Sequence, residues 1–138
     1  MKIYHGSSRK LKVLRPRQAT GIKKAKDRQI AVYATHKKER AIVITLIHLK
    51  GIRGGFELRK INKEVGGIIY GGWPTQKDFY LYELPKKTFS KIDSWQWISK
   101  EEVRPLKVER LEVKDYLYLL KKGSKIREKE ISRKSQKV

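Results

Sequence analysis

The first nine residues of the chain place three groups that can bind or react with a small molecule at one point. Ile3-Tyr4-His5 has the pattern of a short strand, and it runs directly into Gly6 and Ser7. We therefore expect an imidazole, an accessible glycine backbone and a hydroxyl at one strand end. This His-Gly-Ser step has no evident packing purpose. It indicates one wall of a pocket for a flat, polar ligand.

A second candidate wall lies further along the chain, in the segment 29–35. Strand alternation puts Val32 and Ala34 on one face of this segment and Tyr33 and Thr35 on the other. Tyr33 therefore points away from the larger aliphatic residues, as a tyrosine that lines a cleft would. An exposed tyrosine, or one packed in a second core, would give the same pattern.

The elements around these two segments predict a mixed fold. Thr35 can cap a helix over about residues 36–49, whose run 41–47 is apolar on nearly all sides. We expect this helix to be buried, although a strand is the alternative for so β-branched a run. The glycine pairs at 54–55, 66–67 and 71–72 are expected to form turns, because none has the form of a phosphate-binding loop. Further strands are expected at 56–58, 68–70, 79–84, 95–99 and 106–113, the last at a sheet edge, and a short closing helix is expected at 115–122.

The composition limits the classes of chemistry and of partner. The chain of 138 residues has no cysteine and three scattered histidines, so disulfides, thiol catalysis and a zinc site are not expected. Lys and Arg number 35 against 14 Asp and Glu, for a net charge of +21. Such a charge predicts contact with nucleic acid, while a merely solvated basic surface is the alternative. The basic residues expected to contact nucleic acid are Arg9, Arg15, Arg17, Lys23, Lys24 and those of the C-terminal tail.

The same composition predicts the organisation of the chain. We expect one domain over residues 1–122, followed by a basic tail over 123–138 that is nearly without apolar residues. This tail is expected to be flexible, with a solvated extension of the closing helix as the alternative. The longest apolar run is far shorter than the ~20 residues of a membrane span. We therefore expect a soluble, cytoplasmic protein without a membrane partner. The abundance of Lys, Arg, Glu and Ile would also suit a thermophile.

Taken in order, these segments resemble a known enzyme fold. Tyr4-His5-Gly6-Ser7, then the strand with Tyr33, then a helix and a series of short strands resemble the ADP-ribosyltransferase fold. The likeness is to the branch of diphtheria toxin and the poly(ADP-ribose) polymerases, with its His-Tyr-Glu pattern. The order is also similar to that of the tRNA 2′-phosphotransferases. The resemblance spans roughly residues 2–113 and rests on about eight of them.

The resemblance implies a fold, a cofactor and a set of roles. The fold would be α+β, a compact domain of short and mainly antiparallel strands in a split sheet around an NAD-type cleft, with one buried helix after the second strand. In that family the histidine bonds a ribose hydroxyl of NAD, the glycine backbone holds the nicotinamide carboxamide, and the tyrosine stacks on the nicotinamide ring. These roles would fall on His5, Gly6 and Tyr33, with Ser7 helping to hold the carboxamide.

The family's glutamate is the point at which this sequence departs from the pattern. By order along the chain, its position falls on Gln96, so the implied catalytic set is His5, Tyr33 and Gln96. Glu83, Glu101 and Glu102 are the alternative candidates for the position of the family's glutamate.

Three functions therefore stay open. One is an NAD-dependent ADP-ribosyltransferase acting on a nucleic-acid or protein acceptor. The second is an RNA 2′-phosphotransferase, and the third is a basic nucleic-acid-binding module that has the same fold without the reaction.

Overall fold

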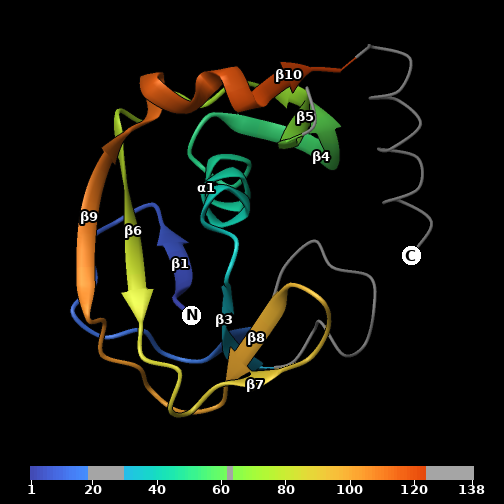
Figure 1. Ribbon diagram of the computed structural model, residues 1–138. Coiled ribbons are helices and arrows are strands. Elements are labelled where there is room, and N and C mark those ends of the chain that lie inside the picture. Colours follow the sequence, from blue (N-terminus) through green and yellow to red (C-terminus); the bar gives the residue numbers. More distant parts are fainter. Residues whose placement is uncertain (19–29, 62–63, 124–138) are drawn as a thin grey trace.

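The computed structural model describes residues 1–18, 30–61 and 64–123 as two β-sheets with a helix between them (Figure 1). The larger sheet has the strand order β7-β8-β3-β1-β6-β9, with β2 paired to β3, and the smaller sheet has the order β10-β5-β4. All pairings in the larger sheet are antiparallel, whereas β10 joins β5 in parallel. The predicted mixed α+β fold with mainly antiparallel strands is therefore confirmed.

The elements have the following bounds. The larger sheet consists of β1 (Ile3–Ser7), β2 (Arg17–Gln18), β3 (Ile30–Thr35), β6 (Asp78–Leu84), β7 (Ser90–Lys91), β8 (Gln96–Ser99) and β9 (Lys107–Glu112). The smaller sheet consists of β4 (Ile52–Ile61), β5 (Glu64–Gly72) and β10 (Leu120–Lys122). The helices are α1 (Lys38–Leu46) and the 3-10 helix η2 (Val113–Leu119).

The larger sheet is packed on both faces. Its first face meets α1, where Phe79 and Leu81 of β6 join a core with Leu46 of the helix. We call this the helix face. Its second face carries a separate cluster around Ile3 and Tyr82. Because neighbouring side chains on a strand point to opposite faces, the parity of a residue number decides which face each side chain serves.

Helix α1 lies close to a glycine on each of its two sides. A Cβ on Gly6 of β1 would lie 1.7 Å from Oγ1 of Thr45 and 3.3 Å from the carbonyl oxygen of Ala41. A Cβ on Gly67 of β5 would lie 2.7 Å from a methyl carbon of Ile47. The helix therefore packs directly on the backbone of both sheets, which explains why five of its residues are buried.

Most predicted strands are confirmed, and so are the buried helix and the edge position of the strand now called β9. The predicted cap is wrong. The helix begins at Lys38 with Lys37 as N-cap, and the hydroxyl of Thr35 instead accepts the backbone N–H of Lys37 at 3.1 Å. Thr35 cannot serve as the cap because it is still paired within the sheet, opposite Gln96.

Two further expectations are wrong. The glycine pairs do not form turns, because Gly54 and Gly55 belong to β4, and the pairs at 66–67 and 71–72 belong to β5. Glycine fits there because the chain segments approach closely: a Cβ on Gly54 would lie 1.6 Å from the carbonyl oxygen of Tyr70. The closing segment is a 3-10 helix followed by β10, since residues 120–122 pair with β5 instead of continuing a helix.

Some expectations fall on residues outside the described ranges. These are Lys23 and Lys24 of the predicted basic surface, and the tail from residue 124 onward. Within the described ranges, no helix is long and apolar enough to cross a membrane.

Replacing Gly6 by alanine tests the contact between β1 and α1. The new methyl group would overlap the Thr45 side chain, and we expect Gly6→Ala to lower the free energy of unfolding by about 1–3 kcal/mol, the usual cost of overpacking. Urea unfolding measures this change. Thr45→Ala in the Gly6→Ala background should recover part of the loss. Strictly additive effects of the two substitutions would show that this contact does not limit packing.

Candidate functional site

The three strands that carry the predicted site residues are neighbours, in the order β8-β3-β1. Strand β6 pairs with all five residues of β1, but β3 pairs with β1 at one position, Tyr4 to Thr35. Beyond Tyr4, the β3-facing edge of β1 has no ladder partner among the described residues. We call the segment His5–Ser7, together with Tyr33 opposite it, the β1–β3 junction.

His5 connects the two strands at this junction. Its Nδ1 lies 2.6 Å from the carbonyl oxygen of Tyr33, and because a carbonyl can only accept, Nδ1 carries the proton. Burial lowers the pKa of His5 below its usual 6.5; the bond to Tyr33 raises it in part, and the charge of Arg17 lowers it further. At neutral pH the imidazole is therefore uncharged. Its Nε2 keeps a lone pair that can accept a hydrogen bond from a hydroxyl.

Tyr82 supports His5 and the chain that follows β1. The two rings have their centroids 6.4 Å apart, and the side chain of Tyr82 is fully buried. Its hydroxyl donates to the carbonyl oxygen of Arg9 at 2.9 Å and accepts the N–H of Leu11 at 2.7 Å. Burial raises the pKa of Tyr82, so the phenol stays protonated and keeps donating. Ser7 has a related task, because its hydroxyl accepts the N–H of Arg9 at 3.3 Å.

Gly6 has a packing role that the sequence did not reveal. The expectation that the His-Gly-Ser step serves no packing purpose is wrong for this residue, because Thr45 of α1 occupies the space that a side chain would need. Because Thr45 covers Gly6 on the helix face, a ligand could reach this backbone only from the face of His5 or along the strand edge.

The side chains of His5 and Tyr33 leave the sheet on opposite faces. His5 pairs with Tyr82 and shares the face of the second cluster, which also holds Val32 and Ala34. By alternation, Tyr33 points to the helix face, where Ile98 is its cross-strand partner. The structure therefore brings His5 to the backbone of Tyr33 instead of its ring.

Gln96 is the third predicted residue and shares the helix face with Tyr33. It is buried, opposite Thr35, and its Nε2 donates to Oδ2 of Asp93 at 2.7 Å. A carboxylate only accepts, so this bond fixes which end of the amide is nitrogen. Oδ1 of Asp93 accepts the backbone N–H groups of Trp95 and Gln96 at 3.0 and 2.8 Å.

Asp93 and Arg40 were missed by the sequence interpretation. The guanidinium carbon of Arg40 lies 4.4 Å from the centre of the Trp95 ring. Burial lowers the pKa of Arg40, and the nearby charge of Asp93 raises it in part. Asp93-Ser94 directly before a strand is a signature of a side-chain-to-backbone turn and would have indicated Asp93. The position of Arg40 on the first turns of α1 has no comparable signal.

The other candidate carboxylates lie elsewhere. Glu83 is on the helix face beside Tyr4, paired with Lys2 at 3.2 Å. Glu102 is exposed and paired with Arg15 at 3.3 Å, and the N–H of Glu101 donates to the hydroxyl of Ser99. Within the described part of the chain, no group of three or more His, Asp and Glu side chains is placed to hold a metal ion.

The described members of the predicted basic surface are Arg9, Arg15 and Arg17. All three are exposed, and Arg17 lies close enough to His5 to influence its pKa. Positive charge is therefore present beside the β1–β3 junction.

Comparison with known proteins adds no identification: no family model, no curated protein and no solved structure matches this chain.

The pKa of His5 predicts how stability depends on pH. Because the folded protein disfavours the charged imidazole, the unfolded chain binds the proton more tightly. The contribution of His5 is complete above pH 6.5 and is lost as the pH falls through the lowered folded pKa. Unfolding free energies measured between pH 7.5 and 4.5 should show this loss in the wild type and in His48→Gln, but not in His5→Gln. An equal slope in all three proteins would contradict the assignment.

The Asp93–Gln96 bond makes a second prediction. Gln96→Glu would place two carboxylates in contact, and we expect a loss of roughly 1–3 kcal/mol at pH 7, typical of a buried group left without its partner. Asp93→Asn in the same protein should recover stability by supplying an N–H donor. Urea unfolding of the single and double variants measures both effects. A Gln96→Glu protein as stable as wild type at pH 7 would show that the bond is not formed.

Proposed function

We propose that this protein binds NAD, or a closely related nicotinamide dinucleotide, at the β1–β3 junction and acts as an ADP-ribosyltransferase-like protein. The observation that carries the proposal is the bond from His5 Nδ1 to the carbonyl oxygen of Tyr33. It holds an uncharged imidazole in one tautomer and leaves Nε2 as an acceptor. A ribose hydroxyl is a donor of matching chemistry.

The backbone of β1 supports the same ligand. A carboxamide has one donor and one acceptor group, which is what an unpaired peptide group needs. Thr45 covers Gly6 on the helix face, so a planar amide would approach this backbone from the face of His5 or along the strand edge, which has no ladder pairing to β3 beyond Tyr4 among the described residues. Tyr33, half-buried on the neighbouring strand, contributes its backbone carbonyl beside His5, while its ring lies on the helix face.

The chemistry at this site would be cleavage of the bond between ribose C1′ and nicotinamide. Nicotinamide leaves with the bonding electron pair, an acceptor oxygen or nitrogen attaches to C1′, and the acceptor loses its proton. A carboxylate near the developing positive charge would accelerate this step. Gln96 has no charge, and the carboxylate of Asp93 is bonded to backbone N–H groups and lies near Arg40. Binding is thus better supported than rapid turnover, and we expect transfer of a single group or slow hydrolysis.

The strong positive charge favours a nucleic acid over a protein as acceptor. It also supports a second candidate function, a nucleic-acid-binding module without turnover. The RNA 2′-phosphotransferase alternative has less support, because Arg15 is paired with Glu102 and only Arg9 and Arg17 remain as described phosphate ligands of the predicted set.

Titration of NAD into the protein, followed by saturation-transfer NMR, tests the proposal. Wild type should bind, and His5→Ala should bind roughly tenfold more weakly, the usual effect of losing one hydrogen bond from a ligand. His48→Ala is a matched control, because His48 also bonds a backbone carbonyl through Nδ1, that of Ile44 at 2.7 Å, and lies on the protein surface.

Two outcomes would overturn the proposal. One is absence of NAD binding at millimolar concentration, and the other is an equal loss in both histidine variants. Salt-sensitive binding of DNA or RNA that is untouched by His5→Ala, in a protein that does not bind NAD, would establish the non-catalytic module instead.

A further inference from the structure

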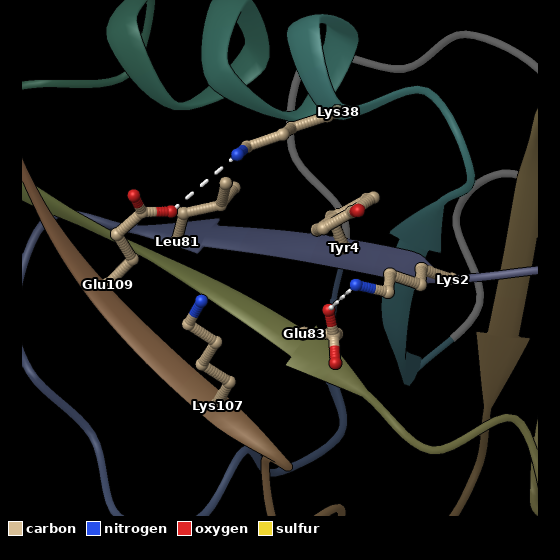
Figure 2. Close-up of a pocket in the computed structure, with 7 residues that line it drawn as sticks. All are labelled: Lys2, Tyr4, Lys38, Leu81, Glu83, Lys107 and Glu109. Carbon is tan, nitrogen blue, oxygen red and sulfur yellow. Dashed lines mark ion pairs between the residues drawn. The ribbon is translucent and has the colours of Figure 1, made fainter.

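A charged pocket of about 90 Å³ lies on the helix face of the larger sheet, at the N-terminal end of α1 (Figure 2). We define the charged pocket by the ammonium groups and carboxylates around it, together with Tyr4 and Leu81. These charged groups belong to Lys2, Lys38, Lys107, Glu83 and Glu109. None of them belongs to the β1–β3 junction.

Strand register places the charged pocket on a continuous polar row. Tyr4 of β1 is opposite Glu83 of β6, and Glu83 is opposite Lys107 of β9. In the other direction Tyr4 is opposite Thr35, which is opposite Gln96. Because neighbouring strands lie about 4.8 Å apart, Tyr4 is roughly 10 Å from Gln96 along this row.

The charged pocket has one more ammonium group than it has carboxylates. Lys2 pairs with Glu83 at 3.2 Å, and Lys38 pairs with Glu109 at 3.6 Å. Lys107 has no carboxylate partner within the described ranges, and Figure 2 shows its ammonium group directed toward the space between the two pairs.

Both ion pairs are open to rearrangement. The two lysine side chains are 69% and 50% exposed, so the pairs contribute little to stability and can give up their geometry to a ligand. The first turn of α1 adds positive potential, because its N-cap residue Lys37 provides no capping side chain. With three lysines against two glutamates, the pocket has a net charge of +1 and therefore favours an anion over a metal cation.

We propose that the charged pocket binds a pentose phosphate. The phosphate monoester would lie on the ammonium groups of Lys2, Lys38 and Lys107, and the sugar hydroxyls would donate to the carboxylates of Glu83 and Glu109. Tyr4 and Leu81 supply the apolar surface for the sugar ring. At about 90 Å³ the pocket is well below the ~300 Å³ at which sites for larger ligands begin, so it would enclose the phosphate and the adjoining part of the sugar, and the rest of the ligand would extend into solvent.

This site is independent of NAD binding at the β1–β3 junction. The ligand can come from a free sugar phosphate or mononucleotide, or from the 5′-phosphorylated end of a nucleic acid. These sources share one chemistry and differ in the chain attached to it.

Chemical-shift titration of the full chain with ribose 5-phosphate, inorganic phosphate and ribose tests the inference. Ribose 5-phosphate should bind most tightly and should shift the resonances of Tyr4 and Leu81. Lys107→Ala should weaken it about tenfold. Lys114→Ala is the matched control, because Lys114 is an exposed lysine beside a carboxylate, Glu112 at 3.2 Å, away from the pocket.

The outcomes separate the possibilities. Equal binding of phosphate and ribose 5-phosphate, or equal effects of the two lysine variants, overturns the inference. Preference for a 5′-phosphorylated over a 5′-hydroxyl oligonucleotide, lost in Lys107→Ala, identifies a nucleic-acid end as the source. Equal affinity for both oligonucleotides, with ribose 5-phosphate still dependent on Lys107, identifies a free sugar phosphate. NAD affinity should be unchanged by Lys107→Ala, so failure here and failure of the proposed function are distinguishable.

Discussion

Helix α1 is held between two sheets by contact with a glycine on either side. Gly6 admits Thr45 against the larger sheet, and Gly67 admits Ile47 against the smaller one. Interiors are packed at crystal-like density, so the helix cannot shift toward either sheet. The other features of the described structure are positioned relative to this layer. They are the core between the sheets, the row of polar side chains from Gln96 to Lys107 near the N-terminal end of α1, and the side from which β1 can be approached.

That constraint gives the two faces of the larger sheet different tasks. Over Gly6 the helix face is occupied, so a ligand can reach this backbone from the face of His5 or along the strand edge. On this second face the imidazole of His5 is uncharged, and its hydrogen bond to the carbonyl oxygen of Tyr33 fixes its tautomer. At the other end of the helix face, the N-terminus of α1 lies beside the lysines and glutamates of the charged pocket. One helix thus separates a site suited to a neutral amide and a hydroxyl from one suited to an anion.

Local patterns predicted a large part of this arrangement. Alternation in the segments of His5, Tyr33 and Gln96 was enough to find three strands that prove to be adjacent, because side-chain period and turn residues are local properties. The contacts of α1 with Gly6 and Gly67 were not predictable, since a glycine that admits a distant helix looks like a glycine in a turn. The pairing of β10 with β5 and the row from Gln96 to Lys107 depend on register between strands far apart in sequence, which no local pattern encodes. Asp93 was not predicted because the alternation that identifies the strand 95–99 carries no information on the side-chain-to-backbone bonds of the turn before it.

The central claim is that the β1–β3 junction holds the nicotinamide end of NAD. Intermolecular nuclear Overhauser effects between NAD and the isotope-labelled protein test it most directly, because they report which protons lie within about 5 Å of each other. The account predicts contacts from ribose protons to the imidazole of His5, and from nicotinamide ring protons to the backbone protons of Gly6 and Ser7. Contacts from the nicotinamide to Tyr4 in the charged pocket, with none at His5, Gly6 or Ser7, would contradict it.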